Sequence, residues 1–206
     1  MKIILFRHGE KQRKDFTIAS DKYDIGLTNL GISQVNKLAK TLAKNFPSLK
    51  SSPIIYSSPY KRTIQSAEII KSVLNIKEIV TFPEFGELYA YTNFQDPLKI
   101  RKNFQAMAMQ NLDWISPETK ISFKNLIFNF LNKLKEISSQ NPNKVILVST
   151  HGGIIRNTVY FLDPKTRPNN DVIEGAKIHE AGYTVLNYDG QNFTVDQFDI
   201  HDHLDK

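Results

Sequence analysis

Short apolar runs rich in β-branched residues alternate with segments of helical periodicity along most of this chain, and this alternation limits the folds open to it. The runs at residues 2–6, 53–56, 76–82 and 144–149 predict strands, most of them buried. Strands that alternate with helices indicate βαβ units and a mostly parallel sheet covered on both faces. The predicted fold class is therefore α/β, a three-layer α/β/α sandwich with a mostly parallel central sheet.

The helical segments have recognisable starts and an apolar stripe. Thr28 is predicted to cap a helix that ends before Pro47, and further helices are predicted at residues 60–74, 122–137 and 154–162. In the helix at 60–74 the spacing places Val73 on the inward face with four other apolar residues. Residues 184–187 and 193–198 flank a turn and predict a β-hairpin, and residues 200–206 read as a polar tail.

The chain has 206 residues, a length that fits one domain. We expect a single domain over residues 1–206, because no linker, repeat or low-complexity tract divides it. Residues 83–118 are aromatic-rich and lack a clean period, which predicts an insertion or cap at about 83–120. That segment and the polar loop at 164–176 are expected to determine which substrate binds.

Composition excludes several kinds of chemistry. The chain contains no cysteine, so it has no thiolate nucleophile, cysteine zinc site or iron–sulfur cluster. Its net charge of +6 fits an anionic partner, but no nucleic-acid-binding motif accompanies the charge. No signal peptide and no apolar run of about 18 residues is present, so we expect a cytoplasmic protein with no membrane partner.

Two histidines occupy equivalent places in the predicted sheet. His8 follows the strand at 2–6 and His151 follows the strand at 144–149, and each precedes a glycine. Because ligands of open α/β sheets bind at the carboxyl ends of the strands, we expect the two imidazoles to share one pocket. Arg7 and Arg62 fall at the same carboxyl end of the sheet, and the backbone N–H of Gly152 would adjoin the pocket. This set predicts a site for a phosphate dianion.

Four sequence blocks, in order, resemble the histidine phosphatase superfamily, which includes the cofactor-dependent phosphoglycerate mutases. They are residues 7–10 (RHGE), 27–34 (LTNLGISQ), 57–67 (SSPYKRTIQSA) and 149–153 (STHGG). Each block alone is a weak signal, whereas four in the right order are specific. The resemblance implies a phosphoglycerate mutase-like fold.

The resemblance also implies a role for each matching residue. His8 would be the nucleophile that takes the phosphoryl group as a phosphohistidine. Arg7, Arg62 and His151 would hold the phosphoryl oxygens, with His151 also counted among the catalytic residues. Lys11 departs from the family pattern, which usually has Thr or Ser at that position.

The resemblance further implies a carboxylic general acid after the third strand. Two carboxylates fit the family pattern of an apolar residue, any residue and then Glu, namely Glu84 and Glu87. Glu87 is preferred because the aromatic stretch that follows it resembles that of related phosphatases. Glu84 stays the alternative.

These features together predict a metal-independent phosphomonoester phosphatase that needs no cofactor and acts on a phosphorylated small molecule. A phosphopeptide substrate stays open, and so does the oligomeric state. Two alternatives are a cofactor-dependent phosphoglycerate mutase-type phosphoryl transfer and a phospho-ligand binding protein without turnover.

Overall fold

The computed structural model describes residues 1–12, 25–51, 54–87, 111, 113–115, 120–166 and 178–205 of the chain. Most of the segment predicted as a cap and most of the loop at 164–176 lie outside the described residues. None of the helices in these ranges is long and apolar enough to cross a membrane.

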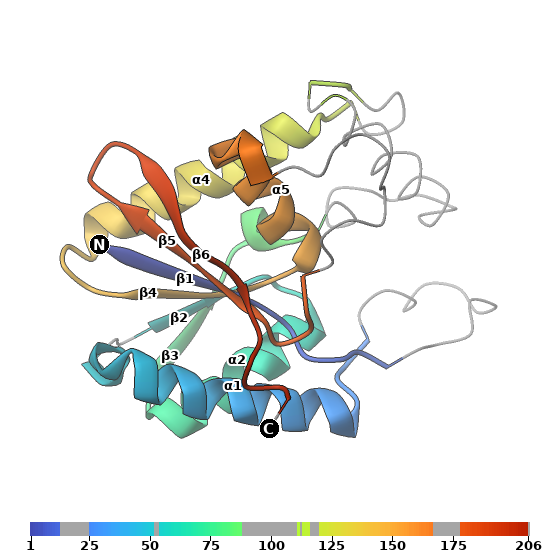
Figure 1. Ribbon diagram of the computed structural model, residues 1–206, viewed down its shortest axis with the longest axis vertical. Helices are drawn as coiled ribbons and strands as arrows, with labels where there is room; N and C mark the ends of the chain where they lie inside the picture. The colour runs from blue at the N-terminus through green and yellow to red at the C-terminus, as the bar shows by residue number, and fades with distance from the viewer. Residues whose placement is uncertain are drawn as a thin grey trace.

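The described residues form a mostly parallel sheet, as the alternating pattern predicts (Figure 1). Its strands lie in the order β3-β2-β4-β1-β5-β6. The first four in that order are parallel, whereas β5 runs antiparallel to β1 and forms the predicted hairpin with β6. The bounds are β1 Lys2–Arg7, β2 Ile54–Ser57, β3 Glu78–Thr81, β4 Ile146–Thr150, β5 Tyr183–Tyr188 and β6 Phe193–Ile200.

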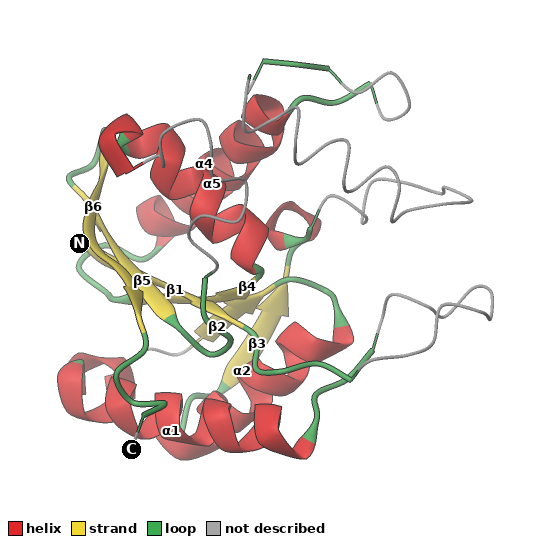
Figure 2. Cartoon of the chain, turned by 45° about the vertical axis from the view of Figure 1, so that its right-hand side comes forward, coloured by secondary structure: helices red, strands yellow, loops and turns green. Residues whose placement is uncertain are grey.

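Helices cover both faces of the sheet, which confirms the three-layer arrangement (Figures 1 and 2). On one face lie α1 and α2, and on the other lie α4 and α5. Their bounds are α1 Asn29–Asn45, α2 Lys61–Leu74, α4 Phe123–Gln140 and α5 Gly152–Leu162, with short 3-10 turns η1 Pro47–Ser51, η2 Pro83–Phe85 and η4 Pro164–Thr166. Side-chain caps start two of these helices: the hydroxyl of Thr28 accepts from the N–H of Gly31, and that of Ser122 accepts from the N–H of Asn125.

The central strands are buried on both faces, which explains their nearly continuous apolar sequence. In β1, Ile4 and Phe6 belong to the apolar cluster under α1 and α2, whereas Ile3 and Leu5 belong to the cluster under α4 and α5. The sheet thus separates two cores and is held by both.

Two details differ from the sequence-based expectations. Val73, predicted to face inward, is 42% exposed at the end of α2. The C-terminal tail is not uniformly solvated: His203 is buried, and its imidazole bonds to the carbonyl oxygen of Ala181.

Candidate active site

The two predicted histidines lie together at the carboxyl end of the sheet. His8 directly follows β1 and His151 directly follows β4, and these parallel strands are hydrogen-bonded neighbours. The N–H of His8 donates to the carbonyl of Thr150, and the two imidazole centroids are 5.4 Å apart. Both side chains are buried. Adjacent strand ends therefore bring together residues that are far apart in the sequence.

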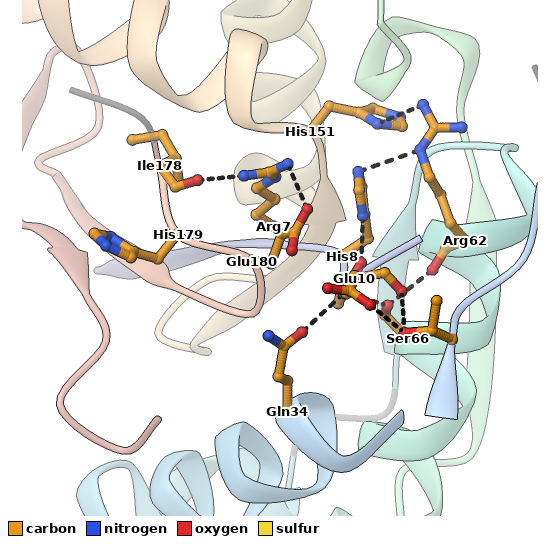
Figure 3. A network of polar contacts seen from close by, with 12 residues as sticks. Arg7, His8, Glu10, Gln34, Arg62, Ser66, His151, Ile178, His179 and Glu180 are labelled. Carbon is orange, nitrogen blue, oxygen red and sulfur yellow. Dashed lines mark hydrogen bonds and ion pairs between the residues drawn. The ribbon is translucent and has the colours of Figure 1, made fainter. Parts of the chain in front are cut away.

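Arg62 joins the two imidazoles (Figure 3). It projects from the first turn of α2 and is only 2% exposed. Its Nε–H donates to His8 Nε2 at 3.2 Å, and its Nη2 contacts His151 Nδ1 at 3.1 Å. The ring of Tyr60 covers the guanidinium of Arg62, with 4.6 Å between the ring centroid and the guanidinium carbon. This arrangement fixes a buried positive charge between the histidines.

Hydrogen bonds assign the tautomer of each neutral imidazole. His8 Nδ1 is 2.7 Å from the carbonyl oxygen of Gly9, which can only accept, so Nδ1 carries the proton and Nε2 keeps its lone pair. His151 Nδ1 accepts from Arg62, so its Nε2–H donates to the hydroxyl of Ser58 at 2.8 Å. The lone pair of His8 thus faces Arg62 and the interior of the site.

The environment of His8 favours that neutral form. Burial is the largest cause that lowers the pKa of His8 well below its ordinary value of 6.5. Repulsion between imidazolium forms of His8 and His151 and the charges of Arg62 and Arg7 lower it further. The bond to Gly9 acts in the opposite direction. His8 is therefore neutral at neutral pH, and its Nε2 lone pair accepts the hydrogen bond from Arg62 in this structure.

Arg7 extends from the end of β1 toward a different part of the chain than Arg62 does (Figure 3). Its guanidinium donates to the carbonyl of Ile178 and pairs with the carboxylate of Glu180 at 3.1 Å. A Cβ added to Gly152 would lie 3.1 Å from Arg7 Cδ and 3.3 Å from its Nε. The side chain of Arg7 thus passes close to the first residue of α5.

The two candidate acids occupy different surroundings. Glu87 pairs with Arg62 at 3.1 Å, and its Oε1 would be 3.9 Å from a Cβ on Gly153. Glu84 lies on the turn η2, with Lys133 as its ion-pair partner at 3.9 Å. The structure therefore brings Glu87 to the histidines through Arg62 and places Glu84 against α4.

Comparison with known proteins identifies the family. The model of the histidine phosphatase superfamily (branch 1) matches residues 3–201. The chain belongs to the histidine phosphatase superfamily. It is thus a superfamily member over nearly its whole length, as the four sequence blocks predict.

Individual relatives of this superfamily member are distant in sequence. It is 26% identical over 210 residues to phosphoglycerate mutase-like protein 4 of Arabidopsis thaliana, covering 99% of this chain and 87% of the relative. It is 26% identical over 207 residues to putative phosphoserine phosphatase 2 of Hydrogenobacter thermophilus, covering 94% of this chain and 93% of the relative. A solved structure of phosphoserine phosphatase from Entamoeba histolytica, in complex with 3-phosphoglyceric acid, has the same fold, with a TM-score of 0.71, 23% identity and 98% coverage of both chains.

The superfamily block at residues 27–34 supports the loop that carries His8. A Cβ on Gly9 would lie 2.4 Å from the carbonyl oxygen of Gly31, and one on Gly31 would lie 2.1 Å from that of Glu10. Both positions therefore need glycine. Gln34 accepts the N–H of Glu10 at 2.8 Å, and the hydroxyl of Thr28 donates to the carboxylate of Glu10 at 2.8 Å.

The block at residues 57–67 supports the same loop from α2. Ser66 accepts the N–H of Gly9 at 3.3 Å, and Gln65 accepts the N–H of Leu27 at 2.8 Å. Lys11, where the superfamily pattern changes, forms an isolated antiparallel bridge with Leu27. The contacts of these two blocks thus hold the site loop in place from α1 and α2, whereas Ser58 and Arg62 of the second block enter the site.

Three site residues were missed by sequence reasoning. Ser58 lies in a recognised block, yet nothing in the sequence indicates that its hydroxyl would meet His151. Ile178 and Glu180 follow the segment predicted as a polar loop, and no motif connects them with Arg7. Their role becomes visible only when β5 is seen to pair with β1.

Proposed function

We propose that this protein is a phosphomonoester phosphatase that acts through a phosphohistidine on His8. The observation that carries the proposal is the fixed tautomer of His8, whose Nε2 lone pair points at the buried guanidinium of Arg62. When the phosphoryl oxygens of the substrate take the N–H of Arg62, the Nε2 lone pair of His8 is released and attacks the phosphorus, and the bond between phosphorus and the ester oxygen breaks. The leaving oxygen takes a proton from Glu87, which acts in its protonated form once the phosphoryl group has replaced it as the partner of Arg62.

The second displacement returns the enzyme to its starting state. Water attacks the phosphorus of the phosphohistidine and gives a proton to the carboxylate of Glu87. The bond between phosphorus and Nε2 breaks, inorganic phosphate leaves, and the lone pair returns to His8. Water is the only co-reactant in this cycle.

Fixed positive charges and N–H donors stabilise the charge on the transferring phosphoryl oxygens. Arg62 lies against Nε2 of His8, and His151 is held beside it by Ser58. Arg7 and the backbone N–H of Gly152 at the start of α5 would complete the pocket. Phosphoryl transfer depends mainly on such positioning and electrostatic stabilisation, so no metal ion or cofactor is needed.

The substrate is proposed to be a phosphorylated small molecule, with phosphoserine and 3-phosphoglycerate as the first candidates. Proteins named phosphoserine phosphatase are among the relatives, and 3-phosphoglyceric acid is bound to a protein of the same fold. We also propose that residues 1–206 form a single domain with a cap at about 83–120. Because phosphorylated metabolites are charged and stay inside cells, the proposed location is cytoplasmic.

A mutase-type phosphoryl transfer is the second candidate, because one relative is named phosphoglycerate mutase-like. The two activities share His8 and differ in the acceptor of the phosphoryl group. A mutase would isomerise phosphoglycerate in the presence of 2,3-bisphosphoglycerate much faster than it hydrolyses the ester.

The test is a panel of phosphorylated metabolites assayed for phosphate release with and without EDTA. We expect hydrolysis of at least one compound, unchanged by EDTA and reduced about a thousandfold or more in His8→Ala. His201→Ala is the matched control, because His201 lies outside the contacts of Arg62. Binding of phosphate without turnover would favour a phospho-ligand binding protein, and loss of hydrolysis in EDTA would contradict the metal-independent mechanism.

A further inference from the structure

The segment at residues 178–182, which leads into β5, contacts the site loop through its backbone. The N–H of Arg7 donates to the carbonyl of Gly182 at 3.0 Å. The N–H of Ala181 donates to the carbonyl of His8 at 3.1 Å. These bonds continue the pairing of β1 with β5 up to the proposed nucleophile. The 178–182 segment therefore lies directly beside the residues that would bind phosphate.

The same segment holds the side chain of Arg7. The carbonyl of Ile178 accepts from one terminal nitrogen, and the carboxylate of Glu180 lies 3.1 Å from the other. The side chains of Arg7 and Glu180 are 20% and 29% exposed, so their ion pair is partly shielded from water. A guanidinium has five N–H donors, which allows it to bind a carboxylate and a phosphoryl oxygen at once.

Asp199, at the end of β6, anchors this segment. Its carboxylate accepts the backbone N–H of His179 at 2.9 Å and meets His179 Nδ1 at 2.7 Å. A Cβ on Gly182 would lie 2.6 Å from the same carboxylate, so only glycine leaves room for it. Asp199 has a φ of 50°, an uncommon value for a residue with a side chain. Both oxygens of Asp199 thus fix the position of His179, one residue before Glu180.

His179, Asp199 and His201 form a cluster whose ligand atoms lie within 4.8 Å of one another, so a metal site is the alternative interpretation. The two imidazoles, however, are stacked at 3.6 Å with 17° between their planes. Nitrogen lone pairs lie in the ring plane, so those of two stacked rings do not converge on one ion. His201 Nδ1 also meets the backbone oxygen of Asp199 at 2.7 Å. The contacts therefore favour an anchor over an ion site.

We propose that Glu180 is a positioning residue for Arg7, and that the His179–Asp199 pair holds Glu180 in place. The inference rests on the proposed function, in which Arg7 binds the phosphoryl oxygens. An unrestrained arginine has many side-chain rotamers, and ordering it on binding costs free energy. Glu180 and the carbonyl of Ile178 restrict the guanidinium before the substrate arrives.

A double-mutant cycle on Arg7 and Glu180 tests this inference, with kcat and KM measured on the best substrate of the panel. Glu180→Ala is expected to lower kcat/KM about tenfold and Arg7→Ala about a hundredfold. Because Glu180 acts only through Arg7, the double variant should match Arg7→Ala within about twofold. Effects that multiply in the double variant, or an unchanged Glu180→Ala, would overturn the proposal.

The anchor is tested with conservative variants of His179. His179→Ala should lower kcat/KM about fivefold, and His179→Asn should recover most of it, because the amide of Asn places an N–H near the position of Nδ1. The matched control is His201→Ala, which removes the stacked ring and keeps the Asp199–His179 contacts; it should change kcat/KM less than about twofold. A loss in His201→Ala as large as that in His179→Ala would overturn the anchor.

A binding measurement separates this inference from the proposed function. Orthovanadate, a phosphoryl analogue, should bind Glu180→Ala about tenfold more weakly than the unmodified protein, as measured by calorimetry. Equal affinity would overturn the positioning role while leaving the phosphatase proposal intact. Full phosphatase activity in His8→Ala would overturn the proposed function independently of this result.

Discussion

At the scale of single residues, one carbonyl oxygen and one guanidinium decide how His8 faces the site. The carbonyl of Gly9 takes the proton-bearing nitrogen, and Arg62 lies against the other. The sequence places two histidines, together with Arg7 and Arg62, at the carboxyl end of the sheet. The structure brings His8, Arg62 and His151 into contact. Sequence alone does not show that Arg62 is buried, because its place on α2 is also that of an ordinary surface residue.

The pKa of His8 leads to a prediction about stability. The folded state keeps His8 neutral, whereas the unfolded chain binds a proton there below about pH 6.5. The free energy of unfolding should therefore decrease as the pH falls below 6.5, since the unfolded state then binds more protons. Denaturant unfolding at pH 7.5 and 5.5 measures this. In His8→Asn, which keeps a donor toward Gly9, the decrease should be smaller; an unchanged pH dependence would contradict the pKa shift.

The assignment of the acid leads to a second prediction at this scale. Glu87→Gln should lower kcat about a hundredfold on alkyl phosphates, whose leaving oxygen needs a proton. It should change kcat far less on p-nitrophenyl phosphate, whose leaving group is a stable anion. Glu84→Gln is the matched control and should retain nearly full activity on both substrates. The reverse pattern, with loss in Glu84→Gln alone, would assign the acid to Glu84.

At the scale of elements, the start of α1 fixes the loop that follows β1. Thr28 caps α1 and donates to Glu10, while Gly31 lets the helix touch the loop backbone. The positions of strands and helices follow from the sequence, because apolar runs and caps are local signals. The exposure of Val73 does not, because Val73 lies beside the stripe that buries Ile70 and Leu74, where helical periodicity alone does not decide burial.

The contact between α1 and the site loop can be tested at Gly31. A Cβ there would lie 2.1 Å from the backbone oxygen of Glu10, so Gly31→Ala must displace the loop. We expect a loss of about 1–3 kcal/mol in the free energy of unfolding together with a fall in kcat. Chemical denaturation and steady-state kinetics measure the two effects. Lys40→Ala, on the exposed side of the same helix, should change neither, and a Gly31→Ala variant as stable as the unmodified protein would refute the close contact.

At the scale of the whole molecule, the sheet separates two apolar cores and holds the site at the carboxyl ends of its central strands. Both cores follow from the sequence pattern, because the strands of the sheet centre are apolar on both faces. Contacts that depend on how distant segments meet do not follow from it. Glu180 pairs with Arg7, which lies 173 positions away in the sequence, and no local sequence pattern predicts this ion pair.

The two cores should contribute independently to stability. Ile70 lies in the core under α1 and α2, and Ile127 lies in the core under α4 and α5, both fully buried. Each Ile→Ala change should cost about 2–5 kcal/mol, and the two costs should add because the sheet separates the sites. Val73→Ala, at an exposed position, should cost less than about 0.5 kcal/mol. Denaturant unfolding of the single and double variants measures these values, and strong non-additivity would contradict two separate cores.

The measurement that tests the phosphohistidine mechanism most directly is the stereochemistry of hydrolysis at phosphorus. An in-line displacement inverts the phosphorus, so two successive displacements, first by His8 and then by water, retain its configuration. We predict net retention with a substrate made chiral at phosphorus by oxygen isotopes and sulfur. Net inversion would mean that water attacks the substrate directly, and would contradict the role proposed for His8.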